Sequence, residues 1–172
     1  MKEDYNGFSE NSDLQKEFVN ASDRVVVIMG AAALDTHLEK LLRKHLINDS
    51  KAVDSLIKSE SNTPLSSFAA RISAAYCLGL ISENDYKDLL IVKKIRNEFA
   101  HELSNCNFDN GSVKDRIGNL IMINDHLKKH PPVGDMSYRI RFIITIYQLD
   151  GMIKNKIQRT THLTILPNTI NT

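Results

Sequence analysis

The residues of this chain whose types could do chemistry together lie in one short stretch, residues 95–101. It holds a strong base (Arg96), an amide (Asn97) and an imidazole (His101) within an apolar helical pattern. An imidazole can act as a general acid or base, and a guanidinium can stabilise the charge of a phosphate. Asn97 would then orient His101 or the phosphate. Arg96, Asn97 and His101 are therefore the candidate catalytic residues.

A helix places these side chains on different sides, because each residue advances by about 100°. The apolar stripe consists of Val92, Ile95, Phe99 and Leu103. Leu90, Lys94, Asn97 and His101 point to nearly the opposite side. Arg96 and His101 lie about 140° apart. One protomer therefore does not aim both at one phosphate, and a site shared across a dimer is the better arrangement.

A structural interpretation competes with the catalytic one. Arg96 lies close to the apolar edge of the helix, where a guanidinium needs a carboxylate, a phosphate or water. It could pair with a buried acid such as Asp35 or Glu39, and His101 could cap or hydrogen-bond a neighbouring helix. The sequence leaves both interpretations open.

The elements that position these residues are all predicted to be helices. Apolar residues recur at three and four positions along most of the chain, and serines stand where three helices would begin, at Ser22, Ser82 and Ser137. We expect helices over residues 22–47, 51–58, 65–79, 82–103, 113–127 and 137–157. A further short amphipathic piece covers residues 13–19. The pattern predicts an all-α, single-domain bundle of about six or seven helices.

The domain organisation follows from the length of the chain and from its two ends. A chain of 172 residues suits one domain with a substantial core and is short for two. Residues 1–21 are expected to form an N-terminal arm or short helix, and residues 22–157 the bundle. From residue 158 the chain turns to Thr and Asn, which predicts a flexible C-terminal tail over residues 158–172.

Composition bears on the partners of the protein. The 22 Lys and Arg residues against 21 Asp and Glu leave a net charge of +1, which disfavours extended phosphate contacts and makes direct sequence-specific DNA binding doubtful. The chain shows neither a secretory signal nor an apolar run long enough for a membrane span, so we expect a cytoplasmic protein. No motif points to a cofactor. His126 and His130 have ligand spacing without a third ligand, so no metal site is predicted.

Two resemblances to known families add to this interpretation. Arg96-Asn97 followed by three residues and His101 resembles the R-x4-6-H signature of the HEPN superfamily. The members of that superfamily are small helical bundles, often dimers, and many are metal-independent ribonucleases. A longer set of motifs resembles the MltR-like, or mannitol operon repressor-like, family over roughly residues 22–108. It comprises Leu34-Asp35 with Leu38-Glu39, and residues 64–72, 75–81 and 94–101.

The longer resemblance implies a cytoplasmic regulatory protein, which we expect to act mainly through contacts with a protein partner. The alternative is a HEPN-type metal-independent endoribonuclease acting on RNA, with Arg96 and His101 in a site shared across a dimer. A homodimer is expected in either case. Its basis is that Leu90, Asn97 and His101 face away from the core of their own helix, and that the first half of the helix over residues 22–47 is apolar nearly all round.

Overall fold

Seven α-helices make up the regular structure of the computed structural model, which describes residues 18, 20–58, 62–102, 106–132 and 134–167. No strand occurs among these residues, so the prediction of an all-α protein is confirmed. The helices are α2 (Asp23–His45), α3 (Ser50–Ile57), α4 (Phe68–Cys77), α5 (Glu83–His101), α6 (Gly111–Gly118), α7 (Ile121–Lys129) and α8 (Tyr138–Arg159). The expected piece at residues 13–19 lies almost wholly outside the described residues.

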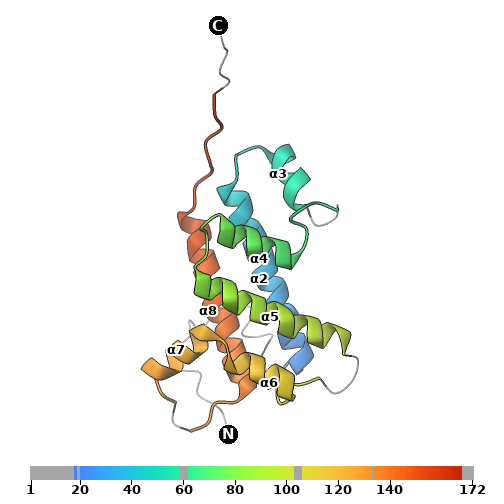
Figure 1. Ribbon diagram of the computed structural model, residues 1–172, viewed down its shortest axis with the longest axis vertical. Helices are drawn as coiled ribbons and strands as arrows, with labels where there is room; N and C mark the ends of the chain where they lie inside the picture. Colours follow the sequence, from blue (N-terminus) through green and yellow to red (C-terminus); the bar gives the residue numbers. More distant parts are fainter. Residues whose placement is uncertain (1–17, 19, 59–61, 103–105, 133, 168–172) are drawn as a thin grey trace.

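Two long helices form the base on which the others pack. Helices α2 and α8 run side by side along the long axis of the molecule (Figure 1). Helices α4 and α5 both contact α2 and each other, while α6 and α7 join α5 to α8. Helix α5, which carries the candidate residues, is therefore supported by four other helices.

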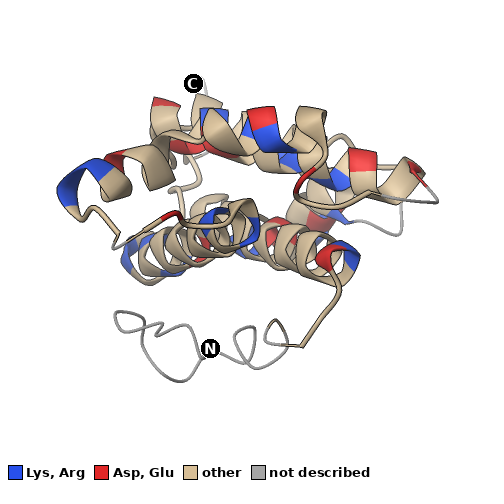
Figure 2. Cartoon of the chain, turned by 90° about the horizontal axis from the view of Figure 1, so that it is seen from below, with Lys and Arg blue, Asp and Glu red and all other residues tan. Residues whose placement is uncertain are grey.

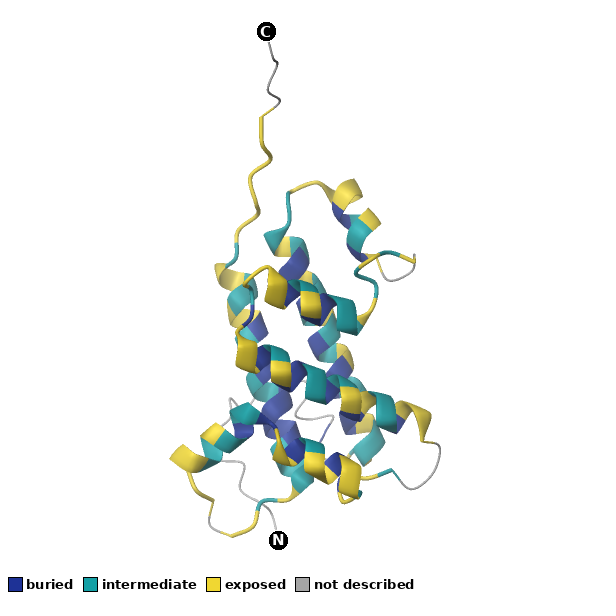
Figure 3. Cartoon of the chain, in the orientation of Figure 1, coloured by how far each residue is buried: buried dark blue, intermediate teal, exposed yellow. Residues whose placement is uncertain are grey.

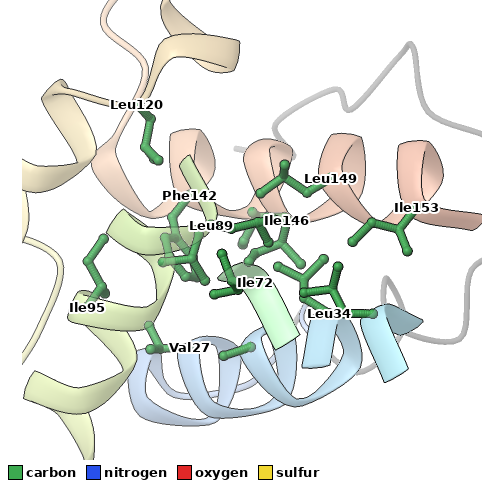
Figure 4. Packing of buried hydrophobic residues seen from close by; sticks show 14 of the residues in the cluster. Val27, Leu34, Ile72, Leu89, Ile95, Leu120, Phe142, Ile146, Leu149 and Ile153 are labelled. Carbon is green, nitrogen blue, oxygen red and sulfur yellow. The ribbon is translucent and has the colours of Figure 1, made fainter. Parts of the chain in front are cut away.

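The core is made by the inner faces of these helices. Figure 4 shows that side chains from α2, α4, α5 and α8 converge with Leu120 on one interior. Helices α2 and α8 approach closely where Gly30 meets Ile146: a Cβ atom added to Gly30 would lie 3.2 to 3.3 Å from three side-chain carbons of Ile146. Gly30 thus permits the tight contact between the two long helices.

The predicted helix starts are confirmed by side-chain caps. The hydroxyl oxygens of Ser22 and Ser137 accept hydrogen bonds from the backbone N–H groups three residues later. Ser82 does the same at α5, and the carboxylate of Asp85 accepts a hydrogen bond from the Ser82 backbone N–H in return. These bonds satisfy N–H groups that have no partner within the helix.

The predicted single helix over residues 113–127 is wrong, because two helices occupy this stretch. Helix α6 ends at Gly118, and α7 begins at Ile121. The buried carboxylate of Asp88 on α5 accepts hydrogen bonds from the backbone N–H groups of Ile121 and Met122, both at 2.8 Å. Asp88 thus caps α7 from another helix, which lets the chain change direction after Gly118.

The burial of Asp88 makes stability depend on pH. Burial is the main cause that raises the pKa of this carboxyl above its ordinary value of 3.8, although the two N–H donors lower it. The folded state therefore holds the proton to higher pH than the unfolded chain does. Between pH 3.8 and the raised pKa, wild type should lose stability relative to Asp88→Asn as pH rises. Urea unfolding of both proteins across this range checks the prediction, and a constant difference would contradict it.

Helix α8 ends at Arg159, two residues after the predicted end of the last helix. Residues 161–167 are exposed and contain no helix (Figure 3). The segment is tied to the end of α2 at two points. The Leu163 N–H donates to the carbonyl of His45 at 2.9 Å, and Nδ1 of His162 lies 2.7 Å from the carbonyl oxygen of Leu46. Within the described residues, no helix is both long and apolar enough to cross a membrane.

Candidate functional site

The three candidate residues on helix α5 differ in how far they are exposed to solvent. Its inner face is fixed by Val92, Ile95 and Phe99, which are fully buried as the stripe predicts, whereas Leu103 lies outside the described residues. Arg96 and His101 are exposed and Asn97 is half-buried. Leu90, expected on the outer side, is half-buried and packs against the core.

Arg96 and Asn97 are hydrogen-bonded to each other at the edge of a hollow. Nη1 of Arg96 donates a hydrogen bond to Oδ1 of Asn97 at 3.0 Å. Both residues line a hollow of about 310 Å³ where α5 meets α2 and the start of α4. Its other walls are Asp35, Lys93 and residues 66–69. The structure thus groups two of the three candidate residues around one concave surface.

Another arginine forms the ion pairs with Asp35 and Glu39 that were expected of Arg96. Arg71 of α4, with 2% of its surface exposed, pairs with Asp35 at 2.8 Å and with Glu39 at 2.6 Å. The Arg71 guanidinium also donates to the backbone carbonyls of Leu65 and Ile57. The hypothesis that Arg96 neutralises these acids is therefore wrong. Arg96 forms no ion pair with any carboxylate in the described part of the chain.

His101 stands apart from the hollow. It is the last residue of α5 and does not line the cavity. At this end of α5 the carbonyls of Phe99 and Glu102 accept hydrogen bonds from the guanidinium of Arg24 on α2. Among the described residues, no side chain hydrogen-bonds the imidazole. The described part of one protomer therefore provides no side chain that orients His101 as an acid or base.

Charged residues of both signs are distributed along the described part of the chain. In the view from below, Lys and Arg positions are interspersed with Asp and Glu positions along the ribbon (Figure 2). No group of three or more His, Cys, Asp or Glu side chains among the described residues is arranged to hold a metal ion. The hollow beside Arg96 stands out because its described wall brings Lys93 and Arg96 together with a single acid, Asp35, which is paired with Arg71.

Sequence reasoning identified Arg96 and Asn97 but not the two serines that line the same hollow, Ser66 and Ser67. Lys93 precedes Arg96 by three residues, a helical spacing that places the two cations on neighbouring parts of one surface. Ser66 and Ser67 belong to a segment that precedes α4, and only the packing of α4 on α5 brings them near Arg96. The spacing was a usable signal for Lys93, whereas none existed for the serines.

Comparison with known proteins identifies the family. A family model described as mannitol repressor, MtlR, matches residues 11–165, which is most of the chain. The chain belongs to the mannitol repressor family. The match extends beyond the region of the sequence resemblance at both ends, into the N-terminal segment and the residues after α8.

Two solved structures share the fold. The first is from the MtlR–HPr complex of Escherichia coli, with a TM-score of 0.66, 18% sequence identity, and coverage of 81% of this chain and 94% of that one. The second is a possible transcriptional regulator, YggD, from Shigella flexneri, with a TM-score of 0.58, 15% identity, and coverage of 90% and 99%. No curated protein matches the sequence.

Proposed function

We propose that this member of the mannitol repressor family is a cytoplasmic regulatory protein that acts mainly by binding another protein. The observation that carries the proposal is the family match over residues 11–165, joined to a shared fold with a protein whose structure is a complex with HPr. HPr, or a protein like it, is the partner we propose here.

The chemistry of the candidate site favours this function over catalysis by a single chain. Arg96 and His101 are exposed and the described residues provide no orienting group for the imidazole. Side chains of this kind suit contacts with a partner, where exposed charges steer association and fix orientation. The near-balance of basic and acidic residues supports protein contacts in preference to direct reading of DNA.

Mixing the protein with HPr from its own organism is expected to give a complex of defined mass. Size-exclusion chromatography with light scattering measures the mass of the protein alone and of the mixture. The protein alone should have the mass of a homodimer, and HPr should add to that mass. HPr that elutes separately at concentrations well above the micromolar range would contradict the partner proposal. A monomeric mass would contradict the dimer.

One observation favours a second candidate, a HEPN-type metal-independent endoribonuclease with a site shared by two protomers. The carboxylates that were expected to form ion pairs with Arg96 form them with Arg71 instead. The Arg96 guanidinium is therefore available to a phosphate. His101 is equally accessible on the surface. In a dimer, His101 of one protomer could act on RNA held by Arg96 of the other.

If the protein cleaves RNA in this way, His101→Ala or Arg96→Ala should each lower the rate by about a hundredfold or more, the usual scale for an acid–base or electrostatic group. The assay incubates pure protein with mixed RNA in EDTA. Lys94→Ala is the matched control, because Lys94 is exposed on the same helix and lies outside the R-x4-H pattern from Arg96 to His101. Circular dichroism must show that each variant is folded. Cleavage that is unchanged in His101→Ala, or absent in wild type, would exclude this candidate.

A further inference from the structure

The hollow between α2, α4 and α5 has the size and chemistry of a ligand site. Its volume of about 310 Å³ lies at the lower end of the range for small-molecule pockets. Three separate elements form its walls, so its shape depends on the packed bundle and does not exist in any one helix.

The charges in this hollow favour an anion. Lys93 and Arg96 reach it from α5, and neither is ion-paired with a carboxylate among the described residues. The acid that the described wall contributes, Asp35, is held 2.8 Å from Nη1 of Arg71, which also pairs with Glu39. The space is therefore lined by two cations and by one carboxylate that is already bound to another arginine, which leaves an excess of positive charge for an anion.

Hydrogen-bond donors lie near the two cations, and phosphate oxygens accept hydrogen bonds from such donors. Arg96 uses Nη1 to donate to Asn97, which holds the guanidinium in place and leaves its other N–H donors for a ligand. Across the hollow, the hydroxyl oxygen of Ser67 accepts the N–H of Ala70. The N–H groups of Phe68 and Ala69 belong to the first turn of α4, where no partner exists within the helix. Hydroxyl and N–H donors thus add to the two cations.

We propose that this hollow binds the phosphate group of a small phosphorylated metabolite, with Lys93 and Arg96 as the main charged contacts. A guanidinium can bind two phosphate oxygens at once, while the ammonium supplies a point charge. The volume accommodates a small organic group beside the phosphate, but not a folded protein segment. The inference goes beyond binding of HPr and does not depend on it. The protein thus binds a small-molecule ligand in addition to its protein partner.

Titration of the full chain with glucose 6-phosphate, followed by amide NMR shifts, tests the proposal. The amide signals of Phe68 and Ala69 should shift in a saturable way, and inorganic phosphate should compete. Glucose without phosphate should leave them unchanged. Lys93→Gln with Arg96→Gln should weaken binding by about tenfold or more, because each removes a charged hydrogen bond. Lys94→Gln is the matched control and should bind like wild type.

Three results would overturn the proposal: no saturable shift with either phosphate compound, equal binding by the double variant, or equal binding of glucose itself. The variants remain interpretable because Arg96 is exposed and Lys93 lies outside the core, so neither change empties buried space. Retention of the wild-type NMR signal dispersion shows that each variant is folded. HPr binding by the wild-type protein, measured beside its titration with the phosphate compounds, separates this inference from the proposed function.

Discussion

Removing both carboxylates that face Arg71, by combining Asp35→Asn with Glu39→Gln, is expected to destabilise the protein by about 3 to 5 kcal/mol. Arg71 is 2% exposed, so the change leaves a buried guanidinium without a counter-charge. For a protein of this size the loss corresponds to a fall in Tm of about 6 to 20 °C. Thermal and urea unfolding measure it.

Two further variants make this prediction specific. Adding Arg71→Met to the double variant should restore part of the stability, because a buried apolar side chain needs no counter-charge. Asp54→Asn is the surface control. It removes one partner of Arg43, whose side chain is about one-third exposed, and should cost about 1 kcal/mol or less. A triple variant less stable than the double variant would show that the buried charge is not the cause.

Phe142→Ala is expected to cost about 3 to 5 kcal/mol, because it empties space at the centre of the bundle. Phe142 of α8 is fully buried, and its ring lies 5.4 Å from that of Phe108, which in turn lies 5.7 Å from Phe99 of α5. The truncation therefore weakens the contact between two helices and the loop between α5 and α6. Urea unfolding should show a lower midpoint with little change in slope.

The control for this truncation is Leu166→Ala. Leu166 is 85% exposed, so the same kind of change there should alter stability by no more than about 0.5 kcal/mol. Similar losses at the two positions would mean that Phe142 is not part of a close-packed core.

Much of the fold could be predicted because local patterns determine it. The stripe of Val92, Ile95 and Phe99 has the period of a helix, and these residues are buried as expected. Serines at three predicted helix starts form the expected caps. The resemblance to the mannitol operon repressor-like family was confirmed by a match longer than the motifs that carried it.

What could not be predicted depends on contacts between distant residues. The apolar period runs across residues 113–127, so nothing local reveals that Asp88 of α5 caps a second helix at Ile121. Arg71 and Arg96 are equally plausible partners for Asp35 from the sequence, and only the packing of α4 on α2 decides between them. The hollow beside Arg96 also requires three helices to meet.

The most direct test of the central claim, a regulator that works through protein contacts, is calorimetric titration of HPr from the same organism into the purified full chain. The account predicts saturable binding with whole-number stoichiometry, a dissociation constant of about micromolar or tighter, and a negative heat-capacity change from buried apolar surface. Binding should persist when RNA is absent and when His101 is replaced by alanine. No saturable heat with HPr, together with RNA cleavage that His101→Ala abolishes, would contradict the claim and favour the ribonuclease.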